Sequence, residues 1–392
     1  MPLSTTSSFL SESHRIPREN KSIMRVNRLS NPFKSSANAA RIVRWIIGAV
    51  ILAFILWRLF TVIVLQHEYG PDTWTRFAIS GLILGGMYAL IAIGYTLVYG
   101  ILFMINFAHG EVMMLGAMGG YFVFEILNAL PTPSASDPKL TFLNAYPVVA
   151  VILAFLVGMI VSSTMGYFLE RIAYRPLRNA PRLVPLISAI GASIFLQNAA
   201  QLLFGPQRRN FTNPIILSRG TGWNIPIGES TVIVTYTGVF SFALSILLMI
   251  GLYLLVQRTK LGRAMRAVAQ DKKTAALMGI DVNAVISRTF IISGILAGAA
   301  GVMWGIHQGI VYYYIGFLPG IKAFTAAVMG GIGNIPGAMV GGLFLGLLES
   351  MGPAALGIDF QLKDVIAFSI LVLVLIFRPS GILGEALSEE KI

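Results

Sequence analysis

Apolar stretches separated by short polar segments fill the chain from about residue 42 to residue 377. In helical form, roughly 20 apolar residues cross the ~30 Å hydrocarbon core of a bilayer. The stretches do not alternate in polarity residue by residue, as the strands of a membrane β-barrel do. The pattern therefore predicts an all-α fold, a polytopic transmembrane helical bundle of about ten spans. They are about residues 42–65, 77–101, 111–127, 146–170, 183–204, 232–256, 284–305, 318–331, 335–351 and 365–377.

Basic residues between these spans predict the orientation of the bundle. An even number of spans puts both termini on one side, and the basic N-terminal segment marks that side as cytoplasmic. The basic loops 171–182 and 257–283 fall on the same side, and the loop 131–145 falls outside. The loop 205–230 is predicted to be external although it holds three arginines, which long external loops tolerate.

Composition divides the chain into four parts. Residues 1–40 are polar and basic and predict a disordered cytoplasmic tail. Residues 41–76 predict an extra membrane anchor with a short external loop, 77–383 form the main bundle, and 384–392 form a cytoplasmic C-terminal tail. An organellar transit peptide is the alternative for the first part, but Glu12 and Glu19 interrupt the acid-poor pattern of such peptides.

Charge and cysteine content exclude several classes of protein. The 392 residues are 56% hydrophobic and 12% charged, with a formal net charge of +12. Because the basic residues sit in tails and short loops, the positive-inside rule explains the charge, and no nucleic-acid partner is expected. The absence of cysteine excludes disulfides and thiolate chemistry.

One polar segment, 257–281, interrupts the apolar pattern late in the chain. It predicts a basic helix from Arg263 to Met278 that Gly279 ends at its C′ position, with Asp281 ready to cap the next helix. A plain pore needs only a short turn here. We therefore interpret the segment as a docking surface for a soluble partner, the alternative being an interfacial helix held by anionic lipid.

Within this segment, two kinds of residue suit docking. The small residues Ala275, Ala276 and Gly279 let a partner approach the backbone closely, and Arg263 and Arg266 belong to the basic surroundings that fix its orientation.

A second polar group joins two spans at residues 105–111 and contains Asn106, His109 and Glu111. In one interpretation these side chains cap the adjoining helices, with Glu111 facing a positive helix N-terminus. In the other, the group breaks a helix and lines or gates a passage. A metal site is not expected, because no further ligand stands at suitable spacing.

Glycines at GxxxG spacing recur in the apolar stretches and predict close helix packing, or an interface with a partner subunit in the membrane. The segment 330–337 predicts either a tight turn or an unwound break. Isolated polar residues within spans are expected to be interhelical hydrogen-bond partners: Glu125, Gln197, Asn198, Gln201, His307, Lys322 and Glu349. No G-x-x-x-x-G-K-S/T stretch occurs, so any ATP must be hydrolysed by another subunit.

Several of these stretches together resemble the inner-membrane permeases of branched-chain amino acid ABC importers, of the LivH type. The matching stretches are 88–96, the polar group through Glu111, 170–178, 186–191, the basic loop and 322–328, and the resemblance covers about residues 77–383. The resemblance implies an importer subunit rather than an enzyme, with no cofactor. It also implies a bacterial inner-membrane location and three kinds of partner: a second homologous permease, two cytoplasmic ATP-binding subunits and a periplasmic substrate-binding protein.

By the same resemblance, Ala275, Ala276 and Gly279 are similar to the loop that importer ATPases grip, although Thr274 stands where that motif has glutamate. The first 70 residues have no equivalent in the family. The implied function is ATP-driven alternating access for leucine, isoleucine or valine. Urea or short amides are an alternative within the family. A passive channel or ion-coupled carrier is a distant one, because the paired charge usual near mid-membrane is not evident in the sequence.

Overall fold

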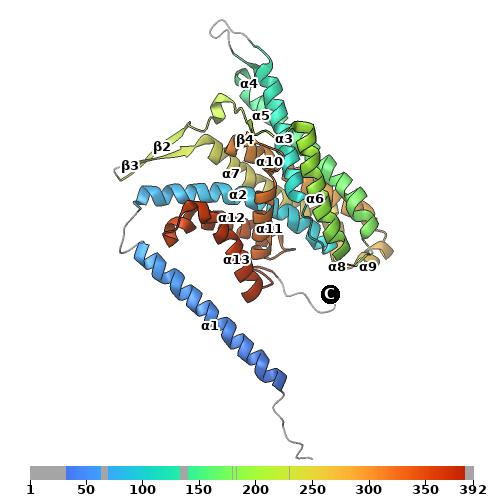
Figure 1. The fold of residues 1–392 in the computed structure, drawn as a ribbon. Coiled ribbons are helices and arrows are strands. Elements are labelled where there is room, and N and C mark those ends of the chain that lie inside the picture. The colour runs from blue at the N-terminus through green and yellow to red at the C-terminus, as the bar shows by residue number, and fades with distance from the viewer. Residues whose placement is uncertain are drawn as a thin grey trace, which may run out of the picture. The chain divides into compact units, whose positions relative to one another are not determined.

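The structure is a computed structural model that describes residues 32–62, 69–132, 140–178, 180–181, 183–228 and 230–384. Its contacts divide the chain into residues 1–54 and 55–392. Figure 1 labels the elements in chain order. The helices are α1 (Pro32–Phe60), α2 (Pro71–Leu102), α3 (His109–Ala129), α4 (Phe142–Ala145), α5 (Pro147–Phe168), α6 (Leu183–Phe204), α7 (Tyr236–Arg258), α8 (Lys260–Gln270), α9 (Lys272–Leu277), α10 (Val282–Gln308), α11 (Phe317–Gly330), α12 (Ile335–Leu356) and α13 (Lys363–Phe377).

Shorter elements connect these helices. A π-helix, η2 (Leu169–Tyr174), continues α5, and the 3₁₀ segments are η3 (Arg175–Leu177), η4 (Ile215–Leu217) and η5 (Phe360–Leu362). Two small antiparallel sheets pair β1 (Arg209–Asn210) with β4 (Ile310–Val311), and β2 (Gly222–Ile227) with β3 (Ser230–Thr235). In the β2–β3 hairpin, Gly222 lies opposite Thr235.

Eight helical segments in the described part are long and apolar enough to cross a membrane. They are Pro71–Leu102, His109–Ala129, Pro147–Leu177, Leu183–Phe204, Tyr236–Arg258, Val282–Gln308, Ile335–Leu356 and Phe360–Phe377. The all-α polytopic bundle is thereby confirmed. The other two predicted spans correspond to the shorter apolar helices Trp45–Phe60 and Phe317–Gly330. At 1.5 Å per residue, the 14 residues of α11 extend only ~21 Å, less than the hydrocarbon core. The number of crossings and the sides of the termini stay predictions.

At the N-terminus, α1 already begins at Pro32, so the end of the predicted tail is helical. The alanine-rich stretch 35–40 favours a helix there. Residues 1–31 and 385–392, which hold most of the two predicted tails, lie outside the described residues.

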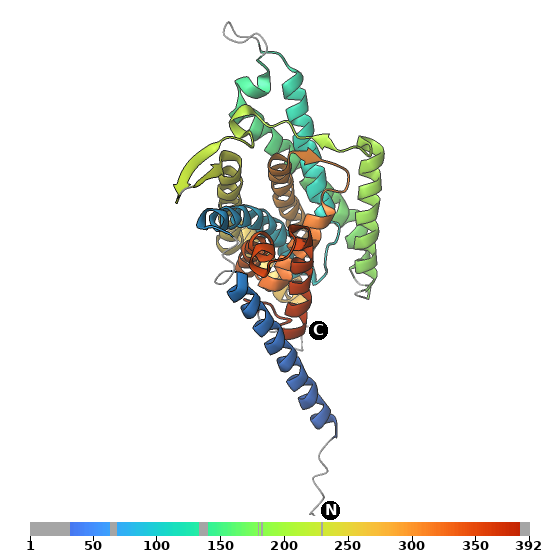
Figure 2. The same ribbon diagram turned by 60° about the vertical axis from the view of Figure 1, so that its left-hand side comes forward.

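The interior of the 55–392 unit is built around α2 and α10. Helix α2 packs against α12, and α10 packs against α3 and α5 (Figure 2). Of the most apolar window in each helix, 83% is buried for α10 and 67% for α2, but only 28% for α6 and 6% for α13. The first two are therefore surrounded by protein, whereas α6 and α13 present most of their apolar surface outward.

Glycines make this close packing possible. A Cβ atom on Gly81 would lie 2.9 Å from the Leu347 Cα atom, and one on Gly298 would lie 2.8 Å from the Met159 Cα atom. All five predicted GxxxG pairs lie close to other parts of this chain, with backbone opposite every member except Gly305, which faces the Phe211 ring. The interpretation as close packing is confirmed. Between α11 and α12, Gly331 and Gly333 have φ of +109° and +96°, and the Asn334 side chain accepts from the Gly337 N–H at 3.1 Å. This segment is the tight turn.

Candidate functional site

The polar segment 257–281 forms two helices, α8 and α9, where the sequence predicted one. The break is at Asp271, whose backbone is extended at φ −155° and ψ 115°. Its Oδ1 atom accepts a hydrogen bond from the Lys273 N–H at 2.8 Å, and its Oδ2 atom accepts one from the Thr274 hydroxyl. Aspartate competes with the helical backbone in this way, so it ends α8 and caps α9. The prediction of a single helix was wrong for this reason.

The end of α9 has the geometry that the sequence predicted. Gly279 has φ of +81°, its N–H donates to the Ala276 carbonyl at 3.0 Å, and the Ile280 N–H donates to the Ala275 carbonyl at 3.1 Å. This pair of bonds is a Schellman motif, which needs a left-handed residue at the glycine position. The Asp281 Oδ1 atom then accepts from the Ala284 N–H at 3.0 Å and caps α10. Both predicted caps are confirmed.

The predicted docking residues differ in how accessible they are. Arg263, Ala276 and Gly279 are exposed, whereas Ala275 is buried in the core of the chain and cannot present its side chain to a partner. The Arg266 guanidinium donates to the Val256 carbonyl and, at 3.3 Å, to the Gln257 side chain. Arg266 thus holds α8 to the last turn of α7.

Sequence reasoning missed the most exposed apolar residues of the segment. Leu277 is 87% exposed and Met278 is 77% exposed, directly before Gly279. The sequence did contain a signal for this exposed tip, because two large apolar residues stand at the end of a short polar segment. Together with Ala276, they give α9 an apolar tip.

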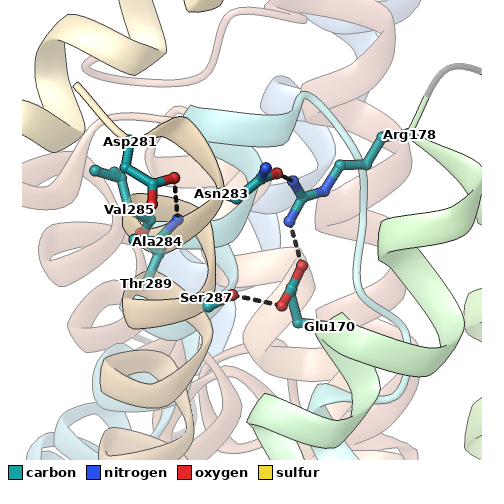
Figure 3. Close-up of polar contacts among 8 residues, drawn as sticks. All are labelled: Glu170, Arg178, Asp281, Asn283, Ala284, Val285, Ser287 and Thr289. Carbon is teal, nitrogen blue, oxygen red and sulfur yellow. Dashed lines mark hydrogen bonds and ion pairs between the residues drawn. The ribbon is translucent and has the colours of Figure 1, made fainter. Parts of the chain in front are cut away.

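A buried junction connects this segment to the end of α5 (Figure 3). Glu170 in the π-helix receives hydrogen bonds from Arg178 and, at 2.6 Å, from the Ser287 hydroxyl of α10. Arg178 also donates to the Asn283 side chain at 2.6 Å, close to Asp281. The Glu170 side chain has no solvent exposure. The junction thus links the first turns of α10, which follow α9 directly, to the segment 170–178.

Near this junction, α9 carries Lys272. Burial, and then the positive charge of Arg178, lower the pKa of the Lys272 ammonium. At the exposed Asp271 carboxyl, the charged form is stabilised. Hydrogen bonds from the Thr274 hydroxyl, followed by those from backbone N–H groups, lower its pKa.

The polar group at 105–111 lies inside the bundle. Asn106, His109 and Glu111 are all buried, and none of them makes a side-chain capping bond at either end of α2 or α3. Glu111 lies in the first turn of α3, as the capping interpretation expected, but no side chain of the group makes a capping hydrogen bond. The chain leaves α2 through Phe103, which adopts a left-handed conformation at φ +56°.

Each of the three side chains faces a different element. The Asn106 Oδ1 atom accepts from the Tyr174 hydroxyl at 2.7 Å, and the Glu111 Oε1 atom accepts from the Gln197 amide at 2.7 Å. His109 Nδ1 lies 3.4 Å from the Ser293 hydroxyl. The group thereby joins α3 to η2, α6 and α10. In the described part of the chain, no three His, Cys, Asp or Glu side chains are placed to hold a metal ion.

A second buried charged group was not foreseen. Lys322 of α11 lies 2.7 Å from Glu349 of α12 and 2.6 Å from Asp364 of α13, and its side chain is 6% exposed. The sequence predicted hydrogen bonds for Lys322 and Glu349 but showed no paired charge. The structure corrects this, because three helices that are separate in sequence meet here.

Comparison with known proteins gives a consistent result. The family model described as the permease component of the branched-chain amino acid transport system matches residues 77–375. The high-affinity branched-chain amino acid transport system permease protein BraD of Pseudomonas aeruginosa is 48% identical over 78% of this chain and 94% of its own length. LivH of Escherichia coli K12 is 45% identical over the same shares. The fructose import permease protein FrcC of Rhizobium meliloti is 26% identical over 64% of this chain. No solved structure matches the chain.

Proposed function

Because this chain belongs to the branched-chain amino acid transport system permease family, we propose that it forms the translocation pathway of an ATP-driven importer for leucine, isoleucine or valine. It is a multi-pass protein of the inner membrane and a transport subunit rather than an enzyme. The observation that carries the mechanism is the ordered α8–α9 segment with its exposed apolar tip. Such a tip in a segment predicted to be cytoplasmic suits contact with a soluble subunit.

Separate ATP-binding subunits supply the energy in this proposal. Two of them dock on α8–α9 and on the equivalent segment of a second, homologous permease, and a periplasmic binding protein delivers the substrate. Leu277, Met278 and Ala276 make the apolar contact, and Arg263 fixes the orientation. Ala275 acts from inside, by seating α9 on the bundle.

Force then passes from the docking segment to the bundle. Helix α9 is followed within a few residues by α10, and Asp281 caps α10 rigidly. The ion pair of Glu170 with Arg178, together with Ser287 and Asn283, couples α10 to the segment 170–178. Movement of α9 therefore moves α10 and the segment 170–178 together against the rest of the bundle, which is the rearrangement that alternating access requires.

Asn106, His109 and Glu111 are proposed to form a gate on this pathway. They sit at the start of α3 and contact three other elements, so a shift of α10 or α6 changes their hydrogen bonds. One polar atom in the group, Glu111 Oε2, has no hydrogen-bond partner among the described residues. A buried polar atom without a hydrogen bond destabilises the state that contains it. Such an atom suits a gate whose side chains exchange hydrogen-bond partners between two conformations.

Uptake measurements test the function directly. Cells that lack the chain are supplied with wild type or with Leu277→Gln, and uptake of labelled leucine and of labelled urea is measured. We expect wild type to restore leucine uptake alone. The Leu277→Gln variant should fold normally, because an exposed side chain affects stability by about 0.5 kcal/mol or less, and should lower uptake several-fold. Its control is Ile225→Gln, an exposed apolar residue on β2.

Restoration of urea uptake by wild type would instead assign the chain to the amide-transporting alternative. Normal leucine uptake by Leu277→Gln would contradict the docking role of the α9 tip.

A further inference from the structure

A cavity of about 260 Å³ opens beside the buried charges of α11, α12 and α13. Four charged residues line it: Lys322, Glu349, Lys363 and Asp364. Its volume is far above the ~10–15 Å³ that one water molecule needs and close to the lower end, ~300 Å³, of small-molecule pockets. The cavity therefore has room for a small solute.

The positive and negative charges that line the cavity are equal in number, but their ion pairs do not fill it. Two lysines face two carboxylates, with Lys322 between Glu349 and Asp364 and the Lys363 ammonium 3.8 Å from the Glu349 Oε1 atom. The Glu349 side chain is only 2% exposed, the Tyr88 hydroxyl lies beside its carboxylate, and its Oε2 atom makes no hydrogen bond of ordinary geometry among the described residues. Lys363 is about half exposed. The arrangement thus offers one anionic acceptor and one accessible cation.

Apolar and aromatic residues form much of the remaining wall, which also includes His307 and Gln308. Tyr88 and Leu84 of α2, Trp304 of α10 and Ile315 before α11 line the same cavity. The Lys322 ammonium lies 6.0 Å from the centre of the Tyr88 ring. A lining that combines charged side chains with apolar and aromatic walls matches a molecule that itself has a charged part and an apolar part.

If the charged residues of α11, α12 and α13 only stabilised the fold, their surroundings would be different. A buried ion pair that only joined α11, α12 and α13 would have its oxygens satisfied and its surroundings filled, since a half-satisfied buried pair is weak stabilisation. Here the buried Glu349 carboxylate faces a cavity, and its Oε2 atom makes no hydrogen bond of ordinary geometry among the described residues. Ionisable residues inside a membrane bundle, next to such a space, indicate a substrate site.

We propose that this cavity binds the zwitterion of an apolar α-amino acid during transport. The substrate ammonium binds the Glu349 carboxylate, its carboxylate binds Lys363, and its side chain lies against Tyr88 and Trp304. The inference rests on the proposed function, whose substrate class it explains. The cavity lies where α10 and α12 end and α11 and α13 begin, which are ends predicted to be external, so it receives substrate on the side where the binding protein releases it.

Thiol labelling tests this proposal without depending on transport. The chain has no cysteine, so Leu318→Cys creates a single thiol at an exposed residue that lines the cavity. Leu362→Cys, equally exposed but outside the cavity lining, is the matched control. The full-length chain is labelled in membrane vesicles with a thiol reagent while leucine is added. The comparison compounds are 4-methylpentanoate, which lacks the ammonium, and 3-methylbutylamine, which lacks the carboxylate.

We expect leucine to slow labelling of Leu318→Cys and not of Leu362→Cys, and both comparison compounds to protect only at much higher concentration. Adding Glu349→Gln should raise the half-protecting leucine concentration about 10- to 100-fold, the effect of losing one hydrogen bond to a charged group. Glu125→Gln, the same change at an exposed glutamate of α3, should leave it unchanged. If Glu349→Gln prevents folding, Lys363→Met provides the same test from the carboxylate side.

Absence of protection, equal protection by all three compounds, or equal protection of the control thiol would overturn the proposal. The uptake experiment is judged separately. Leucine uptake without protection leaves the transport function standing and removes this site, whereas protection without chain-dependent uptake keeps the site and removes the proposed function.

Discussion

Glycine has opposite roles in the two regions that matter most for this permease. In the seam between α2 and α12, Gly81, Gly85 and Gly346 stand where the backbones touch, and any side chain would meet backbone atoms. At the end of α9, Gly279 faces open space, and a Cβ atom there would meet nothing within 4 Å. Its requirement is the left-handed backbone, at φ +81°. The first region uses glycine for its lack of volume and the second for its conformational freedom.

Because of this difference, substitutions in the seam should affect the stability of the bundle, whereas substitutions at the end of α9 should affect its coupling to a soluble partner. A change in the seam acts on the packing of the whole bundle, because α2 is among its most buried helices. A change at the tip of α9 acts on a short exposed segment that contributes little to the core. The following predictions test this separation, from the largest expected effect to the smallest.

Gly346→Val should prevent the chain from folding. The added atoms meet the backbone of α2 at Gly85, and backbone cannot move aside as a flexible side chain does, so the cost exceeds the ~1–3 kcal/mol of ordinary overpacking. The yield of monodisperse protein in detergent and its unfolding temperature measure this. Gly251→Val on α7 is the control, because nothing lies within 4 Å of that position. Equal yields for the two variants would show that the seam is looser than described.

Glu170→Gln should destabilise the junction between the start of α10, which follows the α9 region, and the segment 170–178. The side chain keeps its shape but loses its charge, and Arg178 is left without its carboxylate partner in a largely buried place. Removing one member of a buried pair costs about 3–5 kcal/mol, and less is expected here because Arg178 retains Asn283. Thermal unfolding of the purified chain gives the loss. Arg171→Gln, an exposed neighbouring charge, should change little.

Gly279→Arg should leave the protein folded and abolish transport. The left-handed backbone costs a non-glycine residue ~1–2 kcal/mol, and the bulky cation covers the tip of α9. Gly205→Arg controls for the strain, because Gly205 also follows a helix, has φ of +85° and faces open space. Leucine uptake is measured at matched amounts of membrane-inserted protein. Equal loss in both variants would assign the effect to backbone strain and remove the docking interpretation.

Thr274→Val should have the smallest effect, a change in the pKa of the single carboxyl group of Asp271. The Thr274 hydroxyl is the main cause of the lowered pKa of Asp271, so the variant raises that pKa toward its usual value. Because the folded pKa lies below the unfolded one, the cap stabilises α9 above the unfolded pKa and loses this effect as pH falls through the folded pKa. Titration of carboxyl-labelled aspartate by NMR measures the change. An unchanged Asp271 pKa in the variant would contradict the assigned cause.

Local signals in the sequence determined much of this protein. The apolar stretches predicted the helical bundle, the glycine spacing predicted its close packing, and Gly279 and Asp281 marked the end of one helix and the start of the next. These features depend on residues within one or two helical turns, so the chain's own pattern specifies them.

The tertiary structure decided which residues are exposed to a partner and which residues from different helices contact each other. Ala275 and Ala276 are equivalent in the sequence, but packing buries one and exposes the other. Lys322, Glu349 and Asp364 come from three helices, and no local pattern brings them together. Asn106, His109 and Glu111 were predicted either to cap or to gate, and only the tertiary structure shows that they are buried between helices and make no side-chain capping bond. Long-range contacts are set by how the helices pack, and a single sequence does not display that packing.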